Sequence, residues 1–506
     1  MTNPSDHTKI TSNLASQLSP KDIYDWLMTV GYFPENYVLP PCFIVNKYPS
    51  FGKLYYKVNK KGKYSPITSE LIQMQFPKSN YGERIFSIID PFLHCDLAYE
   101  IANNWDTFLI ILFNPENNVS SYSFPIPLDS DHPGQIGNLR SGRMIYEFIE
   151  MAENAIASEA YRYKFLLISD IKNFYPSIYT HALSWAIHNK SVTHDDKLQR
   201  YDYKNLGNRI DKLFQRSNDD CTNGIPIGPA VADFFSEILL SKVDISFSKE
   251  FVGRQYLAVR FKDDYRILCE SEEDANLIRK TLQNSLREYN IELNESKTNI
   301  YQLPDGIFRP WVSRYNSINP SPRDRYTFKR FKEVFLAVVT IDHDIPGTGV
   351  VDRFLSDILT KEYKPNFEVT EYTIMKIVSL LLMLAKLRIK SFPRVLGIIE
   401  SILRSEKNSK YNSLISGYLA NYLASLATEE RNNRYLIIWI LYFLQSNNFD
   451  SFVDSTLQFS DPLVKSVQNN IGEIFNHCKG YILFEDIRDS AKRVSLLKHL
   501  DVFSPQ

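Results

Sequence analysis

The 506-residue chain is poor in glycine, holds few cysteines and has no long apolar run. Its 18 glycines are about half of ordinary usage, and neither GxGxxG nor GxxxxGKS/T occurs, which excludes the two commonest glycine-rich phosphate loops. The five cysteines form no Cys-x-x-Cys pair, which argues against a disulfide framework or a structural zinc site and is typical of a reducing cytosol. The longest apolar run, Leu436 to Leu444, is too short to span a membrane.

Positive charge is not in excess either. The 58 lysines and arginines are matched by 59 aspartates and glutamates, so any binding of nucleic acid must use local patches. Residues 1–18 lack the apolar core of a secretory signal, and we expect a cytoplasmic protein. One basic patch is residues 47–64, where six lysines are interleaved with aromatic residues and no acid occurs. That composition suits a single nucleic-acid strand, and it equally suits a lysine-protected edge strand.

The chain divides by pattern into three regions. Residues 1–69 are mixed, and residues 70–318 alternate short apolar runs with helical periods. From 319 to 506, beginning at the joint Asn319-Pro320-Ser321-Pro322, apolar residues recur at spacings of three and four, which predicts an all-α domain. Its helical pairs at irregular intervals resemble a HEAT-like repeat, and an ordinary all-α packing domain is an equal alternative.

Two segments of the middle region place aspartate at the end of a predicted strand. The apolar run Phe165–Ser169 ends at Asp170. The runs Tyr256–Phe261 and Tyr265–Cys269 flank Lys262-Asp263-Asp264, which predicts a hairpin with adjacent carboxylates at its tip. Asp170 taken alone could simply cap the next helix. Adjacent carboxylates on a buried hairpin, by contrast, are costly unless a cation compensates their charge.

Helices and a further strand connect these segments. Gly224-Ile225-Pro226-Ile227-Gly228 precedes an amphipathic helix from Val231, and a second helix follows the hairpin from Ser271. Residues 293–298 then lead into a strand over 299–302. This order predicts an α+β fold in which an antiparallel sheet has helices on one face. In a split βαβ arrangement, Asp170 and the hairpin tip meet at one edge of the sheet.

Four short segments, in this order, resemble motifs A, B, C and D of reverse transcriptases. They are Asp170-Ile171-Lys172-Asn173-Phe174-Tyr175, Gly224-Ile225-Pro226-Ile227-Gly228, Phe261-Lys262-Asp263-Asp264 and Leu293-Asn294-Glu295-Ser296-Lys297-Thr298. The resemblance implies a right-hand core of fingers and palm in residues 70–318. It also implies a nucleotidyltransferase of the RNA-directed DNA polymerase family, which uses deoxynucleoside triphosphates and two Mg²⁺ or Mn²⁺ ions.

The resemblance assigns roles to the acidic residues and to one lysine. Asp170 and Asp263 match the carboxylates that bridge the two ions, and Asp264 matches a secondary one. The carbonyl of Ile171 matches an additional ligand. Lys297 matches the motif D lysine that protonates the departing pyrophosphate, although a surface lysine is nearly as expected.

The resemblance also predicts where the incoming nucleotide binds. Tyr175 matches the steric gate that excludes ribonucleotides, with a core tyrosine as the alternative. The backbone amides of residues 172–175 should face the triphosphate, and two fingers arginines are further candidates. The full predicted nucleotide-binding set is Lys172, Asn173, Phe174, Tyr175, Gly224, Ile225, Pro226, Gly228, Arg140 and Arg143.

Two features resemble the bacterial abortive-infection (AbiK-type) reverse transcriptases in particular. They are the run Phe174-Tyr175-Pro176-Ser177-Ile178-Tyr179-Thr180-His181 and the lack of glutamine after Gly-Ile-Pro. This resemblance implies phage defence, a homo-oligomer, a C-terminal helical repeat and untemplated DNA synthesis primed by a tyrosine. The partner is then a single-stranded DNA product, attached to the chain where a tyrosine primes. Tyr48, amid the lysines of residues 47–64, is the first candidate for priming.

Other functions stay open. Ile227 and Ala232 replace the glutamine and serine that related enzymes place near the templating base, which weakens the expectation of template-directed copying. A template-dependent retron-like or group II intron-like enzyme is an alternative, although those enzymes place a short thumb after motif D. A non-catalytic nucleic-acid-binding assembly protein is another alternative, against which the intact acids Asp170, Asp263 and Asp264 argue.

Overall fold

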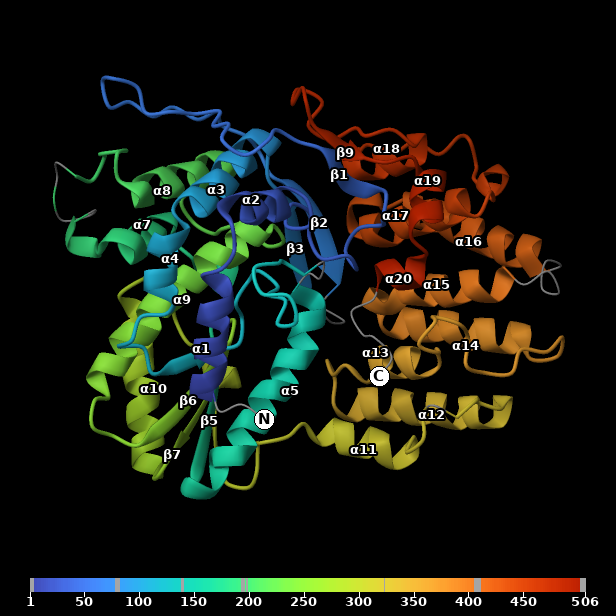
Figure 1. Ribbon diagram of the computed structural model, residues 1–506. Coiled ribbons are helices and arrows are strands. Elements are labelled where there is room, and N and C mark those ends of the chain that lie inside the picture. Colours follow the sequence, from blue (N-terminus) through green and yellow to red (C-terminus); the bar gives the residue numbers. More distant parts are fainter. Residues whose placement is uncertain are drawn as a thin grey trace. The chain divides into compact units, whose positions relative to one another are not determined.

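The computed structural model describes residues 4–77, 82–137, 141–192, 196, 199–322, 324–404 and 411–500, with the backbone only for 141–149 (Figure 1). The chain forms two compact units. The first holds residues 1–34, 48–72 and 87–308, and the second holds 35–47, 73–86 and 309–506. This grouping differs from the division at 69 and 318 that the sequence pattern suggests, because two segments from the N-terminal part belong to the same unit as the C-terminal helices.

The first unit combines helices with a five-stranded sheet. Its helices are α1 (Pro4–Ala15), α2 (Pro20–Met28), α3 (Pro91–Asn103), α4 (Trp105–Leu112), α5 (Ser141–Glu159), α6 (Phe174–Ser177), α7 (Thr180–His188), α8 (Leu206–Ser217), α9 (Ala230–Glu250) and α10 (Glu272–Arg287). Its strands are β4 (Val119–Ser121), β5 (Phe165–Asp170), β6 (Tyr256–Phe261), β7 (Asp264–Cys269) and β8 (Asn299–Gln302). They lie in the order β4-β6-β7-β5-β8.

The sheet is mixed rather than wholly antiparallel. β5 pairs antiparallel with β7 and β8, and β6 pairs antiparallel with β7, which confirms the predicted hairpin. At the edge, however, β4 runs parallel to β6. The prediction of an antiparallel sheet is wrong for this strand, whose 3 residues are too few to show an alternating pattern. The fold is a mixed α+β fold.

Helices cover both faces of the sheet. On one face Leu166 and Leu268 pack against Ile156 of α5. On the other face the Tyr265 hydroxyl donates to the carboxylate of Asp244 in α9, and α10 packs against β5 and β7. Figure 1 shows α5 on the opposite side of the strands from α9 and α10. The expectation of helices on one face is therefore wrong, and two-sided burial explains why β5 is an uninterrupted apolar run.

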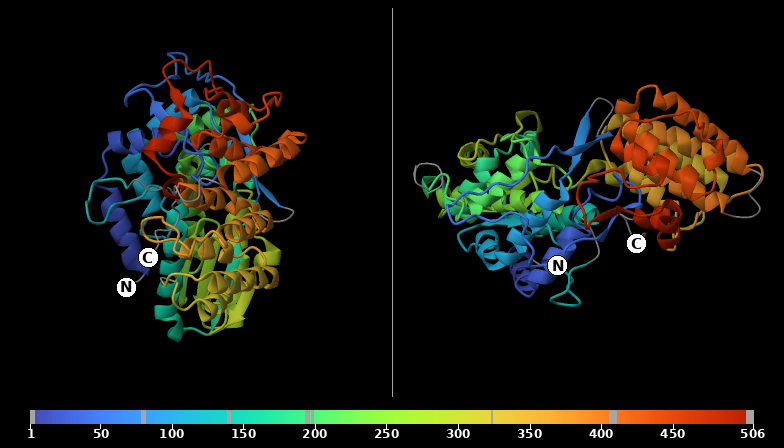
Figure 2. Two further views of the ribbon diagram at one scale, coloured as in Figure 1. Left: turned by 90° about the vertical axis from the view of Figure 1, so that its right-hand side faces the viewer. Right: turned by 90° about the horizontal axis from the view of Figure 1, so that it is seen from above.

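The second unit is mainly helical. Its helices are α11 (Pro310–Ile318), α12 (Phe328–Asp344), α13 (Val350–Asp357), α14 (Ile374–Leu387), α15 (Phe392–Leu403), α16 (Asn412–Ala427), α17 (Glu430–Ser446), α18 (Pro462–Asn469), α19 (Ile487–Arg493) and α20 (Leu496–His499). β1 (Phe43–Lys47) pairs antiparallel with β9 (Ile482–Phe484), and β2 (Ile72–Pro77) pairs with β3 (Glu83–Ile88). Figures 1 and 2 show the larger helices of this unit running roughly side by side.

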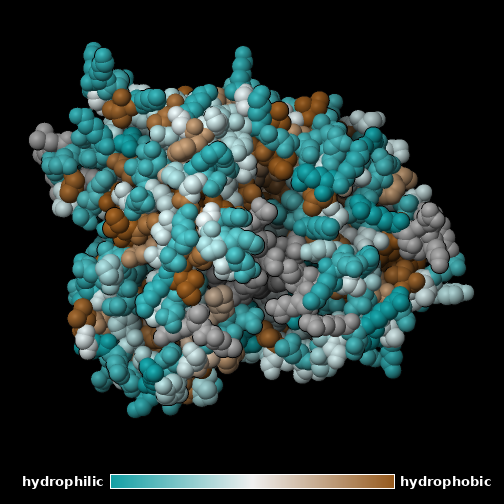
Figure 3. All heavy atoms as spheres, in the orientation of Figure 1, coloured by the Kyte–Doolittle hydropathy of each residue, from teal (hydrophilic) through white to brown (hydrophobic). Residues whose placement is uncertain are grey.

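The long apolar run of the sequence forms the centre of this second unit. Every residue from Tyr435 to Leu444 in α17 is buried, and α17 contacts α15, α16, α18 and α19. A helix that is apolar all round must be covered on all sides. None of the helices in the described ranges is long and apolar enough to cross a bilayer. On the face shown in Figure 3, apolar residues are scattered among hydrophilic ones. The HEAT-like repeat stays a prediction.

Candidate active site

The β6–β7 hairpin brings two aspartates to the end of β5. Phe261 pairs with Asp264 across the turn, in which Lys262 has a φ of 50°. In the neighbouring strand pair, Asp264 is the register partner of Asp170. The amide of Ile171 donates to the carbonyl oxygen of Asp263 at 3.2 Å. The structure thus brings Asp170, Asp263 and Asp264 together where β5 ends and the β6–β7 turn begins. We call this end of the sheet its acidic edge. The catalytic roles of the three residues stay predictions.

Lys297 is the cation that contacts this acidic group. Its Nζ lies 2.7 Å from Oδ2 of Asp170, and 53% of its side chain is exposed. Partial burial lowers the pKa of Lys297, but the hydrogen bond to Asp170 and the charges of Asp264 and Asp263 outweigh burial and raise it. Lys297 ends a short 3₁₀ turn whose position is fixed by Asn294, since the Asn294 amide donates to the carbonyl oxygen of Asp170 at 2.7 Å.

Negative charge exceeds positive charge at this edge. Asp264 is exposed as a whole residue, yet burial of its carboxyl group, followed by the charges of Asp263 and Asp170, raises its pKa to about 7. Neighbouring carboxylates disfavour each other's ionisation, and Lys297 offsets one charge of three. A set of carboxylate oxygens with excess negative charge fits hard divalent cations such as Mg²⁺ or Mn²⁺. The three aspartates are therefore the residues that would hold these ions.

A buried arginine, which sequence reasoning missed, holds the hairpin from behind. The Arg260 side chain is 0% exposed, and its guanidinium lies 2.8 Å from Glu237 and 2.9 Å from Asp244, both in α9. Its Nη1 donates to the carbonyl oxygen of Lys262 at 3.1 Å, and the Lys262 amide donates to Ser123 Oγ at 3.0 Å. These bonds fix the hairpin turn. The sequence did contain a signal for this network. Arg260 is a charged residue inside an apolar strand, and α9 carries two acids two helical turns apart.

Backbone hydrogen bonds join the motif around Tyr175 to the Gly-Ile-Pro turn. The Ile225 amide donates to the carbonyl oxygen of Tyr175 at 3.1 Å, and the Gly224 amide donates to that of Ile178 at 2.9 Å. Gly224 has a φ of 86°, and a Cβ there would lie 3.3 Å from the carbonyl oxygen of Pro176. This turn therefore requires glycine, which lets two of the four motifs lie against each other.

The side chain of Tyr175 is anchored at its far end. Its hydroxyl donates to the carboxylate of Asp233, in the first turn of α9. Ser236 Oγ lies 3.4 Å from the same hydroxyl, and Lys262 Nζ lies 3.5 Å from Asp233 Oδ1. Burial, followed by the charge of Asp233, raises the pKa of Tyr175, so the phenol stays protonated and donates. Asp233 thereby links Tyr175, α9 and the hairpin turn.

The other predicted nucleotide-binding residues are only partly accounted for. Lys172 and Asn173 are exposed, and Phe174 is buried. The amide of Lys172 donates to the carbonyl oxygen of Glu292 at 2.9 Å, because antiparallel pairing continues past the end of β5. The prediction that this amide faces a triphosphate is therefore wrong. Of the two fingers arginines, Arg140 lies outside the described residues, and the side chain of Arg143, in α5, is not described either.

The segment 47–64 holds the priming candidate Tyr48. No strand continues beyond Lys47 in this segment, so the interpretation as a lysine-protected edge strand is wrong. The ring centroids of Tyr48 and Tyr24 lie 6.4 Å apart. Burial, followed by the charge of Asp25, raises the pKa of Tyr48, which disfavours the phenolate that a nucleophile needs. In the described structure Tyr48 contacts α2 rather than the acidic edge of the sheet.

The sheet is part of a mixed α+β fold in which carboxylates at neighbouring strand ends converge. Residues 126–328 match the family model for "Reverse transcriptase (RNA-dependent DNA polymerase)". This part of the chain is a reverse transcriptase domain, and it contains all four of the motifs that resemble that family. The family resemblance and the assignment as an enzyme of the RNA-directed DNA polymerase type are confirmed.

Solved structures of two telomerases are similar to the chain at low identity. Telomerase from Candida albicans, in complex with a fragment of telomeric RNA, has 11% identity and a TM-score of 0.30, with 74% of this chain and 64% of the telomerase chain covered. Apo telomerase from Candida tropicalis has 13% identity and a TM-score of 0.33, with coverage of 78% and 71%. Scores this low carry no functional information. No curated protein matches the chain.

Proposed function

We propose that this chain synthesises DNA from deoxynucleoside triphosphates by two-metal nucleotidyl transfer. The observation that carries the proposal is the register pairing of Asp170 with Asp264, beside the turn that bears Asp263, inside a reverse transcriptase domain. Asp170 and Asp263 would bridge two Mg²⁺ or Mn²⁺ ions, with Asp264 and the carbonyl of Ile171 as further ligands. When bound, these ions neutralise charge on the transferred phosphoryl group and align the attacking and leaving oxygens.

Two other side chains act on the nucleotide in this proposal. Lys297 carries a proton at Nζ and is exposed enough to deliver it to the departing pyrophosphate, although the contact with Asp170 raises its pKa and makes it a weaker acid until that contact is released. Tyr175 places its ring where a ribose 2′-hydroxyl would clash. The hydrogen bond from Tyr175 to Asp233 holds the ring in one position, which a steric gate requires.

A direct assay tests the proposal. Purified protein is incubated with each labelled deoxynucleoside triphosphate and Mg²⁺, first without template or primer and then with a primed RNA. We expect incorporation by the natural protein and none by Asp170→Asn or Asp263→Asn. Incorporation by both single variants at the level of the natural protein would contradict the assigned site. Failure of the natural protein to incorporate under either condition would contradict the function.

We further propose that synthesis is untemplated and serves phage defence by a homo-oligomer. The support is the resemblance of residues 174–181 to abortive-infection enzymes, together with Ile227, a half-buried apolar residue that offers a base no side-chain hydrogen bond. Ala232 is fully buried in α9, so this second departure concerns packing and lends no support. Cells that express the natural protein should resist phage, whereas cells with Asp263→Asn should be infected normally.

Priming by a tyrosine of the chain belongs to the same proposal. Tyr48 remains the first candidate, and its raised pKa means that its hydroxyl would need a metal ion to stabilise the phenolate that attacks the α-phosphorus as pyrophosphate leaves. Digestion of the product with protease, followed by mass spectrometry, locates the nucleotide-linked peptide. A linked peptide elsewhere, with unchanged synthesis in Tyr48→Phe, would remove Tyr48 from the proposal.

The matched family model favours a second candidate, the copying of an RNA template. A primed RNA of defined sequence separates the two candidates. Product complementary to that RNA supports copying, and product unrelated to it supports untemplated synthesis.

A further inference from the structure

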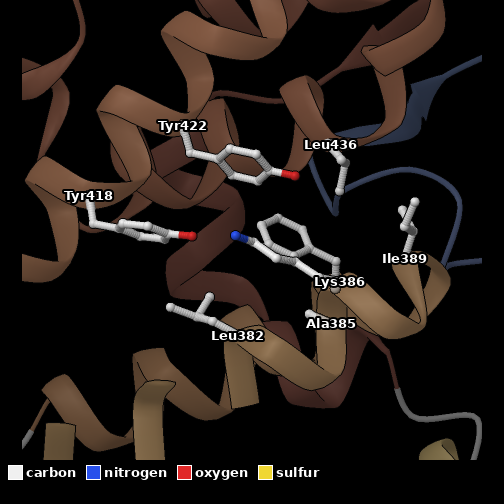
Figure 4. A pocket seen from close by; sticks show the side chains of 8 residues that line it. Leu382, Ala385, Lys386, Ile389, Tyr418, Tyr422 and Leu436 are labelled. Carbon is white, nitrogen blue, oxygen red and sulfur yellow. The ribbon is translucent and has the colours of Figure 1, made fainter. Parts of the chain in front are cut away.

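A cavity in the second unit gathers aromatic rings around a lysine. Its volume is about 140 Å³, and it lies among the helices α14 to α17. Tyr418 and Tyr422 come from α16 and Lys386 from the last turn of α14. Apolar side chains, including Phe392 and Leu436, form the rest of the lining (Figure 4). None of these residues belongs to the reverse transcriptase domain.

The two tyrosines form an aromatic platform. They stand one helical turn apart, with ring centroids separated by 6.3 Å and ring planes inclined by 21°. Tyr418 is 39% exposed, and Tyr422 is half-buried. An accessible pair of nearly parallel rings offers its faces to a planar ligand, and nucleobases stack on such rings whatever their sequence.

The polar side chains of the cavity carry one ammonium and two phenol hydroxyls, each of which can donate a hydrogen bond. Nζ of Lys386 lies 5.6 Å from the ring centroid of Tyr422, and Figure 4 shows it directed toward the phenol oxygen of Tyr418. Within the described ranges, no carboxylate pairs with Lys386 and no hydrogen-bond partner is found for either phenol hydroxyl. Burial raises the pKa of Tyr422, so its hydroxyl keeps its proton. An ammonium and two phenol hydroxyls, with no carboxylate among the lining residues, fit an anionic group.

We propose that this cavity binds one nucleotide unit of single-stranded DNA. The base would enter the apolar space beside Phe392 and stack on a tyrosine ring, while the phosphate would accept hydrogen bonds from Lys386 and the phenols. A ligand with both a planar apolar face and an anionic group uses the whole lining, whereas an acidic peptide would leave the tyrosine ring faces and the apolar side chains unused. The choice of strand rests on the proposed function, because single-stranded DNA is its product.

Equilibrium binding of labelled oligodeoxythymidylate to the full chain, without Mg²⁺ or nucleotides, tests this inference. We expect Tyr418→Ala to weaken binding by roughly 5- to 100-fold, the usual range for loss of one stacked base. Lys386→Gln should lower the slope of log affinity against log salt by about 0.7. Tyr372→Ala, at an 83% exposed tyrosine of the same unit outside the cavity, is the control and should change neither. Tyr418 and Lys386 are both exposed, so these variants should fold, which thermal unfolding verifies.

Photocrosslinking locates the contact. A strand that contains 4-thiothymidine should attach to a peptide of α16, and mass spectrometry identifies that peptide. The inference is overturned if no adduct forms on α16, if Tyr418→Ala binds like the natural protein, or if thymidine monophosphate competes as well as the strand does. Binding without any DNA synthesis would contradict the proposed function alone, and synthesis with unaltered binding in Tyr418→Ala would contradict this inference alone.

Discussion

The buried network behind the β6–β7 hairpin and the acidic group at its tip differ in how completely their charges are compensated. In the network, every guanidinium nitrogen of Arg260 donates to a carboxylate oxygen of Glu237 or Asp244. Tyr265 adds a hydrogen bond to Asp244 at 2.7 Å. Such complete bonding offsets much of the cost of removing charges from water, although burial still raises the pKa of Asp244 to about 6. The network joins the hairpin to α9 and thereby sets the position of its turn.

At the tip the compensation is incomplete. Lys297 is hydrogen-bonded to Asp170, while Asp263 and Asp264 add two further acids to the same edge. Burial, followed by repulsion from Asp263 and Asp170, raises the pKa of Asp264 to about 7. This crowding costs folding energy and makes sense where cations bind. From this difference we predict that substitutions in the network mainly change stability, whereas substitutions at the tip mainly change synthesis.

The largest expected effect is that of Asp263→Asn on synthesis. Loss of a bridging metal ligand should lower deoxynucleotide incorporation by at least about a thousandfold. Because the substitution also removes one of three repelling charges, the melting temperature without divalent ions should stay the same or rise. Incorporation assays and differential scanning fluorimetry measure the two quantities. A strong loss of stability would mean that the tip is structural.

Arg260→Met should have the opposite profile, with stability as its main effect. The substitution leaves Glu237 and Asp244 buried without their partner, which typically costs about 3–5 kcal/mol in the free energy of unfolding. Arg254→Met is the matched control, because Arg254 pairs with Asp274 at 3.1 Å with 53% of its side chain exposed. The control should change the free energy by less than about 1 kcal/mol. Urea unfolding measures the free energy of unfolding of both variants. Equal losses in Arg260→Met and Arg254→Met would refute the role of the network.

Substitutions at Tyr175 should alter sugar selection by an intermediate amount. Tyr175→Ala removes the ring and should raise ribonucleotide incorporation, relative to deoxynucleotide incorporation, by about 10- to 100-fold. Tyr175→Phe keeps the ring but loses the bond to Asp233, so a smaller increase is expected, and Asp233→Ala should match it. The double variant with Tyr175→Phe and Asp233→Ala should show the same ratio of ribonucleotide to deoxynucleotide incorporation as either single variant. Single-nucleotide incorporation with both sugars measures this ratio, and an unchanged ratio in Tyr175→Ala would refute the gate.

The smallest effect concerns a half-buried histidine of the second unit, His499, which is neutral rather than charged. Burial lowers the pKa of His499 from 6.5 to about 4, and its Nε2 lies 2.9 Å from the carbonyl oxygen of Leu39. Between pH 6.5 and about pH 4 the unfolded state binds more protons than the folded state. The stability that the neutral His499 contributes is therefore fully present above pH 6.5 and is lost as pH falls. His499→Gln should therefore lose less stability than the natural protein between pH 7 and pH 4.5. Parallel acid dependence of the two proteins in urea unfolding would contradict this.

Local patterns were sufficient to predict the strands that carry the acids. The apolar run before Asp170 and the two β-like runs around Asp263 each show their structure within a few residues. Their convergence followed from the order of strands and helices, since a split βαβ arrangement leaves few ways to pair these strands.

The features that escaped prediction depend on pairing between distant residues. β4 consists of 3 residues and shows no hydrophobic period of its own, so the sequence pattern could not predict its parallel pairing with β6. The amide of Lys172 is used by Glu292, a backbone contact on which side-chain types have no bearing. The sequence shows Arg260 as a charged residue in a predicted strand. Its partners Glu237 and Asp244 could be identified only from the position of α9 against the sheet.

Titration with Mn²⁺, followed by electron paramagnetic resonance in the presence of a non-hydrolysable deoxynucleoside triphosphate, tests the central claim most directly. If Asp170, Asp263 and Asp264 hold the ions, the natural protein should bind two Mn²⁺ per chain, and Asp263→Asn should bind fewer and more weakly. Equal stoichiometry and equal affinity in the two proteins would contradict the claim that this edge of the sheet is a metal-dependent active site.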